Sequence, residues 1–293
     1  MRASHLHSFD GTEIYYTVSG QGPIDFVLCD GIGCDGFIWR YLRDELATRG
    51  RIIHAHMRGH GRSHKPRDPR HVEIRHLADD LNLVLTAERQ NPTVVLGHSM
   101  GVQVALELWH RHPHHVGALI LMCGSYGNPV ATFHDDPTLE RILPLIKQAA
   151  HLGGDRLHRI WKRLIGLPIA FHVAQATEIH PDLTRREDFE PYLKHLADMN
   201  PGLFFRMLGC AGDHSAEAYL SEIDVPVLVI AGEHDRFTPA RLSEKMADGI
   251  PNAQLLLVED GTHTAPIEHP VLVNLSVTDF LDKLDWTPPH LDT

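Results

Sequence analysis

Apolar residues in the first half of the chain follow two alternating periods. Short β-branched or apolar runs predict strands of a sheet that is buried on both faces. These runs cover Thr12–Val18, Ile24–Cys29, Arg51–Met57, Thr93–Leu96 and Ala118–Cys123. Between them, apolar residues recur at helical spacing, as in Leu77–Gln90 and Gly101–Arg111. This alternation predicts an α/β fold: a mostly parallel sheet covered by helices on both faces.

The alternation stops after Cys123 and returns near Val225. The span from Gly127 to Asp224 has no convincing buried strand, but three of its segments have helical periodicity: "DPTLERILPLIKQAAHL", "DRLHRIWKRLIGL" and "EDFEPYLKHLADM". An unstructured loop of this length is implausible in a compact domain. We therefore expect residues 128–221 to form a helical cap, inserted into a core of residues 1–127 and 222–293. The later core is predicted to contain strands Val225–Ala231 and Gln254–Val258, a helix from Pro239, and a last helix from about Ile267 to Leu284.

A glycine-rich stretch, "LCDGIGCDGFIW", follows the strand that ends at Cys29. Its glycines have the G-x-G-x-x-G spacing of a dinucleotide-binding loop. Such a site needs an acidic residue at the end of the next strand, about 20 residues on, to bind the ribose hydroxyls. Here that strand ends in Met57 and Arg58. Because arginine could instead bind a phosphorylated ribose, the loop alone leaves this interpretation open.

The segment "TVVLGHSMGVQVAL" carries the strongest chemical signal. Gly97 to Gly101 form G-x-S-x-G between a β-branched run and an amphipathic helix, which is the context of a nucleophile elbow. In such a tight turn Gly97 and Gly101 must lack side chains, because neighbouring backbones come close. The amides at the start of the helix can stabilise a developing negative charge. Ser99 is therefore predicted to be a nucleophile; the alternative is a glycine-flanked turn with an idle serine.

A serine nucleophile needs a base and an acid that orients the base. Two later strands run into candidates: Asp235 lies in "GEHDRFTP" and His263 in "GTHTAPIEHP". The order Ser99, Asp235, His263 is that of the triad found in α/β-hydrolases. The competing residues, which we expect to be less well placed, are Glu233, Glu259 and Asp260 for the acid, and His98 and His269 for the base.

Taken together, these motifs resemble the α/β-hydrolase superfamily, in particular capped serine hydrolases of the esterase, C–C hydrolase and haloperoxidase-like branch. The resemblance rests on "DGTEIYYTVSGQGP", "LCDGIGCDGFIW", "MRGHGRS", "GHSMG", "GEHDRFTP" and "GTHTAPIEHP". It implies an eight-stranded, mostly parallel sheet with the cap inserted after the sixth strand. It also implies an oxyanion hole formed by the backbone N–H groups of Ile32 and Met100, with Gly31 and Gly33 shaping the loop. In this frame the dinucleotide interpretation fails.

The chain departs from the family pattern at two positions. Asp30 stands where a histidine usually precedes the loop glycines, and Met57 stands where an aspartate is common. A carboxylate aimed at the oxyanion would oppose it electrostatically. We therefore expect Asp30 to turn away and to accept backbone N–H bonds within its own loop.

Composition and charge limit the kinds of partner that the protein is expected to bind. A net charge of -11, with histidines neutral, argues against binding of nucleic acid or an anionic membrane through broad electrostatics. No targeting or membrane segment is evident, so a cytoplasmic location is expected. The four scattered cysteines lack the paired C-x-x-C spacing of a zinc or redox site. Among the 24 histidines, "HAH" and "HRHPHH" could in principle bind a metal, but the first has no third ligand close in sequence and the second lies at the end of a predicted helix. We expect reduced cysteines, no metal and no cofactor; the sequence does not determine the oligomeric state.

The predicted function is hydrolysis of carboxylic esters with small to medium hydrophobic acyl groups. Apolar side chains of the predicted cap suggest such a pocket: Ile142, Leu143, Ile146, Trp161, Leu164, Phe204 and Phe205. Lactone opening, C–C bond hydrolysis and cofactor-free perhydrolysis use the same triad and remain alternatives. A thioesterase is less favoured and would use a basic patch comprising Arg58, Arg62, Lys65, Arg67 and Arg70. A non-catalytic ligand receptor is the alternative from another class.

Overall fold

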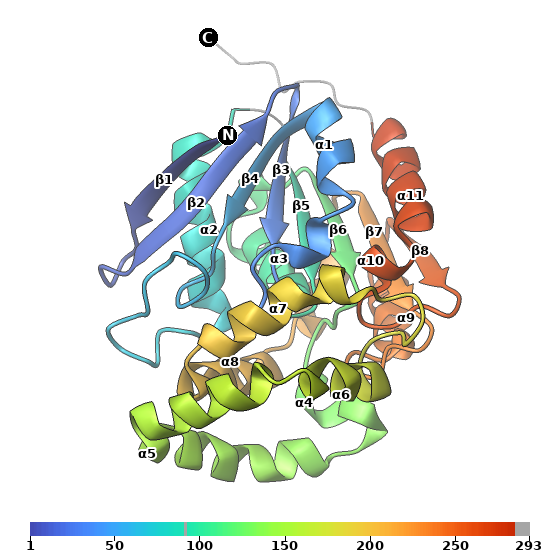
Figure 1. Ribbon diagram of the computed structural model, residues 1–293. Helices are drawn as coiled ribbons and strands as arrows, with labels where there is room; N and C mark the ends of the chain where they lie inside the picture. Colours follow the sequence, from blue (N-terminus) through green and yellow to red (C-terminus); the bar gives the residue numbers. More distant parts are fainter. Residues whose placement is uncertain (91–92, 285–293) are drawn as a thin grey trace.

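The computed structural model describes residues 1–90 and 93–284 and contains an eight-stranded sheet with the order β1-β2-β4-β3-β5-β6-β7-β8 (Figure 1). The strands are β1 Arg2–His7, β2 Glu13–Gly20, β3 Ile24–Cys29, β4 Gly50–Ala55, β5 Thr93–His98, β6 Ala118–Met122, β7 Val227–Gly232 and β8 Ala253–Val258. β1 and β2 pair antiparallel, as do β2 and β4, whereas every later pair is parallel. The predicted sheet is confirmed. The last residues of the chain, 285–293, lie outside the described part.

Alternate side chains of the central strands enter two separate cores. In β3, Val27 packs with one core cluster and Phe26 with the other, because successive strand residues point to opposite faces. The first cluster includes α2 (Ile74–Glu88), α3 (Met100–Arg111) and α9 (Ala240–Gly249), and the second includes α1 (Arg43–Arg49) and α11 (Pro270–Asp282). Burial on both faces explains why the central strands read as unbroken apolar runs.

A helical insertion connects β6 to β7 and lies at the end of the sheet to which the parallel strands point (Figure 1). Its helices are α4 Pro129–Thr132, α5 Thr138–Ile165, α6 Ile169–Thr177, α7 Arg186–Asp198 and α8 Pro201–Asp213. An antiparallel bridge between Gly127 and Ser215 joins the two ends of the insertion. α5 is kinked at Gly154, which has a φ of 47°, so the two helices expected there meet at a glycine. The division at residues 128–221 stays a prediction.

Two elements differ from the sequence expectation. β1 is an additional strand, paired with β2 from Arg2 to His7. The last helix is split into α10 (Ala265–Glu268) and α11, because Pro270 disfavours a helical conformation at His269.

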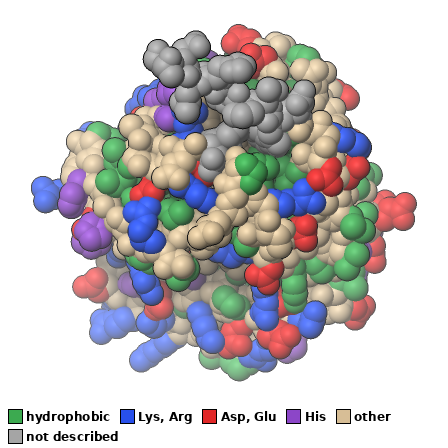
Figure 2. Space-filling model, turned by 90° about the horizontal axis from the view of Figure 1, so that it is seen from above, with side chains coloured by type: hydrophobic (Ala, Val, Ile, Leu, Met, Phe, Trp, Pro, Cys, Tyr) green, Lys and Arg blue, Asp and Glu red, His purple; other side chains and the backbone are tan. Residues whose placement is uncertain are grey.

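Among the described helices, none has both the length and the apolar character that crossing a membrane requires. The face at the top of Figure 1 carries interspersed acidic and basic side chains (Figure 2).

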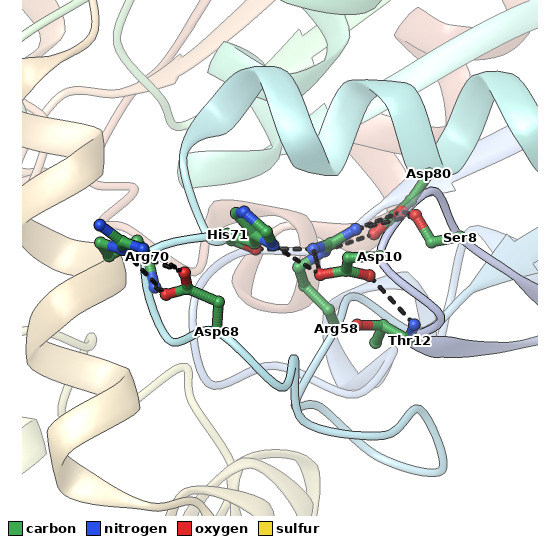
Figure 3. A network of polar contacts seen from close by, with 8 residues as sticks. All are labelled: Ser8, Asp10, Thr12, Arg58, Asp68, Arg70, His71 and Asp80. Carbon is green, nitrogen blue, oxygen red and sulfur yellow. Dashed lines mark hydrogen bonds and ion pairs between the residues drawn. The ribbon is translucent and has the colours of Figure 1, made fainter.

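Arg58 is buried, so its expected place in a surface basic patch is wrong. Its guanidinium donates to Asp80 at 2.7 and 2.6 Å, to Asp10 at 3.1 Å and to Ser8 Oγ at 2.9 Å (Figure 3). A further bond, of 2.7 Å, reaches the carbonyl of His71. Arg58 therefore fastens the turn after β4 to the β1–β2 turn and to α2. Another patch member, Arg70, is exposed but pairs with Asp68 (Figure 3).

Candidate active site

Ser99 lies at the turn between β5 and α3, with φ 56° and ψ −124°, a conformation that non-glycine residues rarely adopt. The chain is tight on both sides of it. A Cβ atom on Gly97 would lie 2.5 Å from the carbonyl oxygen of Gly101, and one on Gly101 would lie 2.0 Å from that of Cys29. Both positions therefore require glycine, as the elbow motif predicts, and the turn lifts Ser99 to the carboxyl edge of the sheet.

The structure brings Ser99, Asp235 and His263 into one hydrogen-bonded chain. His263 Nε2 lies 2.9 Å from Ser99 Oγ, and His263 Nδ1 lies 2.9 Å from Asp235 Oδ2. Since a carboxylate only accepts, Nδ1 carries the proton and Nε2 is free to accept one from the serine. This is the arrangement a base needs to activate a serine hydroxyl.

The acid loop holds the Asp235 carboxylate in place. Its Oδ1 accepts the backbone N–H groups of Phe237 at 2.8 Å and Thr238 at 2.9 Å, and Oδ2 accepts the Thr238 hydroxyl at 2.9 Å. Burial opposes protonation of His263, but the negative charge of Asp235, together with Glu178, outweighs burial and raises the pKa of His263 above its usual value. Phe237 stacks on the imidazole at 4.9 Å between ring centroids.

Three of the competing residues, Asp260, Glu233 and His98, have other partners. Asp260 lies 3.2 Å from His180 Nε2, and Glu233 accepts the backbone N–H of Asp260. His98 Nε2 bonds the backbone oxygen of His263 at 2.9 Å, so it supports the histidine loop. His269 stands between α10 and α11. The geometry agrees with the choice of Asp235 and His263.

The glycine loop lies against Ser99. A Cβ atom on Gly31 would come within 2.9 Å of the Ser99 Cβ, so a side chain there would displace the serine or the loop. Gly33 has a φ of 71°, in the left-handed region. Ile32 and Met100, whose N–H groups are the candidate oxyanion donors, both line a cavity with Ser99. Their role stays a proposal.

Two histidines that the sequence did not single out form hydrogen bonds with the backbone N–H and carbonyl groups of Gly33. The Gly33 N–H donates to His60 Nε2 at 2.9 Å, and the Gly33 carbonyl accepts from His195 Nδ1 at 2.8 Å. His195 Nε2 accepts in turn from the Gly61 N–H at 2.8 Å. Both histidines are therefore neutral in a fixed tautomer, and burial lowers the pKa of His60 to about 4. His195 belongs to α7, so the insertion is bonded directly to the glycine loop.

The expectation for Asp30 was wrong in its partners. Its Oδ1 accepts from Trp39 Nε1 at 2.7 Å, and its Oδ2 lies 2.7 Å from His54 Nε2; both partners are side chains, not backbone N–H groups of its loop. Burial disfavours the charge, but the interaction with His54 outweighs this cost and lowers the pKa of Asp30. With one partner on each oxygen, the carboxylate anchors the glycine loop to β4.

Two cavities share Ser99, Ile32 and Phe237 as wall residues. The larger cavity has a volume of about 390 Å³ and extends under the insertion, where its apolar wall includes Leu164, Ile165, Leu167, Ile169, Val173 and Ile179. The smaller cavity, of about 20 Å³, has room for little more than one water-sized group. Of the insertion residues expected to form the pocket, Leu164 lines the larger cavity, whereas Trp161, Phe204 and Phe205 pack against one another.

No cluster of metal-ligating side chains occurs within residues 1–90 and 93–284. His54 and His56 of "HAH" are neighbours, with ring centroids 5.3 Å apart, but each faces a carboxylate: Asp30 for His54 and Asp35 for His56. All four cysteines are free, and Cys29, Cys34 and Cys123 are buried. Burial raises the pKa of the Cys34 and Cys123 thiols, which keeps them protonated and unreactive.

A serine on a strained strand-to-helix turn, with its histidine and aspartate on later loops at the same edge of an eight-stranded sheet, defines the α/β-hydrolase class. The chain belongs to the alpha/beta hydrolase family, whose model matches residues 26–274.

Comparisons with individual proteins agree with this family. Protein ABHD8 of Mus musculus is 28% identical over 262 residues, covering 89% of this chain and 56% of that protein, so the chain spans about half the length of that relative. A putative carbamate hydrolase, RutD of Pseudomonas savastanoi, is 28% identical and is covered over 98% of its length by 92% of this chain. The crystal structure of a hydrolase from Pseudomonas aeruginosa PA01 superposes with a TM-score of 0.76 at 25% identity, covering 96% of this chain and 98% of that one.

Proposed function

We propose that this protein is a serine hydrolase that cleaves carboxylic esters of small to medium hydrophobic acyl groups through an acyl-enzyme on Ser99. One observation carries the proposal: a continuous hydrogen-bonded chain from Ser99 Oγ through His263 to Asp235, at the wall of an apolar cavity. A buried serine in a merely structural turn needs neither a neutral imidazole at its hydroxyl nor a cavity in front of it.

The geometry supports a two-step reaction. Ser99 Oγ attacks the ester carbonyl while His263 Nε2 takes its proton, and Asp235 stabilises the imidazolium that forms. The oxyanion lies between the N–H groups of Ile32 and Met100. His263 then protonates the leaving alkoxide, and a water molecule, activated by the same histidine, hydrolyses the acyl-enzyme. Every proton transfer in this scheme uses protein side chains, so the proposal includes no metal or cofactor.

The two cavities suggest an asymmetric substrate. A volume of about 390 Å³ is in the range of small-molecule sites, and its apolar wall favours a hydrocarbon group. The smaller cavity admits a substituent of about methyl size. Reciprocal esters distinguish which side takes the acyl group: methyl esters of longer acids should react well if the larger cavity binds the acyl chain, and alkyl acetates if it binds the alcohol.

Carbamates are the second candidate substrates, because the putative carbamate hydrolase RutD matches over nearly its whole length. The same triad would attack a carbamate carbonyl. The size of the larger cavity favours a bigger apolar ester. A panel of esters, N-alkyl carbamates, lactones and diketones, compared by kcat/KM, ranks these possibilities.

The decisive experiment combines p-nitrophenyl butyrate with a fluorophosphonate probe. We expect a burst of p-nitrophenol followed by steady turnover, and a mass increase on the peptide that contains Ser99. The Ser99→Ala variant should show neither. Labelling that survives this substitution, or no labelling and no turnover in the native protein, would overturn the proposed function.

A further inference from the structure

Glu178 introduces a carboxylate into the apolar wall of the larger cavity. It follows α6 directly and stands beside Ile179 and close to Val173, which line the same cavity. Among the described residues of this wall, Glu178 is the one acidic residue, and neither lysine nor arginine is present. Its charge contributes to the raised pKa of His263, which places it within electrostatic reach of the proposed base.

One oxygen of this carboxylate is fixed and the other has no protein partner. Oε1 accepts from His134 Nε2 at 3.0 Å. His134 is itself held, because its backbone N–H donates to the carbonyl of Arg236 in the acid loop at 2.8 Å, and its φ of 53° is left-handed. Oε2 of Glu178 is buried, and within the described residues nothing donates a hydrogen bond to it. The orientation of Glu178 is therefore set from one side only.

A structural glutamate in the same region shows what full pairing looks like. Glu268 is buried, and its Oε1 accepts hydrogen bonds from the hydroxyls of Thr184, Thr262 and Thr264 and from the backbone N–H of His180. Its Oε2 accepts the backbone N–H of Thr262 at 2.8 Å, so Glu268 joins the histidine loop to the insertion with both oxygens. Glu178 has no comparable set of donors, although an unpaired buried acceptor costs about 1–3 kcal/mol. Burial accordingly raises the pKa of Glu178.

We propose that Glu178 is a specificity-determining residue, whose incompletely paired carboxylate accepts a hydrogen bond from an N–H or O–H group on the part of the substrate that fills the larger cavity. A protonated amine is the best donor, because it also neutralises the carboxylate, and the rings of Phe37, Phe189 and Tyr192 in the same wall suit a cation. The absence of lysine and arginine from the described wall disfavours an anionic substrate. This inference rests on the proposed ester hydrolysis at Ser99.

The test uses three p-nitrophenyl esters of one rigid acid: cyclohexanecarboxylate, its trans-4-hydroxy derivative and its trans-4-amino derivative. The trans geometry prevents internal attack on the ester. In the native protein we expect kcat/KM for the amino ester to exceed that of the plain ester by about tenfold or more, with the hydroxy ester in between. Glu178→Gln keeps the shape and the bond from His134 but presents an NH₂ group to the cavity, so the preference should disappear or reverse.

Two further variants make the result specific. Glu178→Leu should raise kcat/KM for the plain ester and lower it for the amino ester, because the wall becomes wholly apolar. Glu222→Gln removes a carboxylate that is exposed on the surface and should leave all three values unchanged. If the plain ester is hydrolysed but Glu178→Gln leaves the ratio of amino to plain ester unaltered, the role of Glu178 is refuted while the proposed function stands.

A binding measurement separates the two proposals fully. Calorimetry with trans-4-aminocyclohexanecarboxamide and cyclohexanecarboxamide needs no turnover. Tighter binding of the amine, lost in Glu178→Gln, supports the inference even if none of the esters is hydrolysed, which would by itself contradict the proposed function. Equal binding of both amides by the native protein would overturn the inference.

Discussion

Two buried sites in this molecule contain the same kinds of residue and differ in what they can do. Ser99, His263 and Asp235 form one; Ser8, Arg58 and Asp80, shown in Figure 3, form the other. Each joins a serine hydroxyl, a nitrogen-containing side chain and a carboxylate at hydrogen-bond distance.

The two sites differ in whether the nitrogen-containing side chain can exchange a proton and in whether a ligand can reach it. The imidazole can give up and take a proton near neutral pH, whereas a guanidinium stays charged. Ser99 lines two cavities, but Arg58 is fully buried and its donors are saturated by Asp80, Asp10, Ser8 and the His71 carbonyl. A serine, a base and an acid therefore indicate chemistry only where the base can titrate and a ligand can enter.

The largest contrast is expected from removing each serine. Ser99→Ala should lower kcat for p-nitrophenyl esters by at least about 10⁴-fold, because the nucleophile is lost. Ser8→Ala should leave kcat unchanged and lower the free energy of unfolding by about 1–3 kcal/mol, since Asp80 and Arg58 each lose a partner. Steady-state kinetics and urea unfolding on both variants check the pair. Equal effects on kcat would show that the sites are not functionally distinct.

Removing the guanidinium should cause the largest loss of stability. In Arg58→Met, two buried carboxylates lose their counter-charge, and we expect the free energy of unfolding to fall by about 3–5 kcal/mol. The kcat of the folded fraction should stay within about twofold, because Arg58 does not contact the Ser99 cavities. The matched control, Arg70→Met, breaks an exposed ion pair and should cost less than about 1 kcal/mol. A small effect of both substitutions would contradict the structural role of Arg58.

Gly31→Val tests the oxyanion loop. The new side chain would collide with Ser99, so the loop must shift, and loss of one oxyanion donor lowers kcat by about 100-fold or more. Binding in the larger cavity should change much less, which calorimetry with cyclohexanecarboxamide can measure. An unaffected kcat would refute the assignment of Ile32 to the oxyanion hole.

A change of pH should affect the two sites in different ranges, without any substitution: activity through His263 and stability through Asp10. The raised pKa of His263 places the acid limb of kcat/KM above pH 6.5, because the base must be neutral. Burial favours neutral Asp10, but hydrogen bonds from Thr12 and His71 and the charge of Arg58 outweigh it and lower the pKa of Asp10 to about 2. This depressed pKa contributes stability that is present above about pH 4 and is lost as pH falls toward 2. At pH 5 Asp10 should thus still stabilise the fold, whereas His60, whose pKa burial lowers to about 4, already costs stability below about pH 6.5. Activity should be reversibly lost at pH 5, as activity after neutralisation would show, and circular dichroism would follow the fold.

The sequence predicts those features of the fold and the site that depend on residues close together along the chain. Continuous apolar runs locate the buried strands, and the glycines around Ser99 are required by backbone contacts within a few residues. The positions of Asp235 and His263 followed from strand ends, because parallel strands deliver their loops to one edge.

A local sequence pattern does not specify contacts between residues that lie far apart along the chain. Burial of Arg58 depends on Asp10, 48 residues away, and Asp80, 22 residues away. Asp30 found side-chain partners in Trp39 and His54, which a loop pattern does not specify. The bond from His195 to Gly33 and the unpaired oxygen of Glu178 both depend on how the insertion packs on the core. The unusual number of histidines was the available signal, but composition does not say which histidines meet.

The bond from His195 to the Gly33 carbonyl has a consequence for recombination between relatives. A transferred insertion that lacks this histidine would leave the Gly33 carbonyl without its donor, and the Gly61 N–H, in the segment after β4, without its acceptor. Chimeras that exchange the insertion should therefore keep a histidine at the position of His195. This residue belongs to the insertion by sequence, but its hydrogen bonds are made to the core. The functional boundary between the two parts therefore runs through α7 and does not coincide with the ends of the inserted segment.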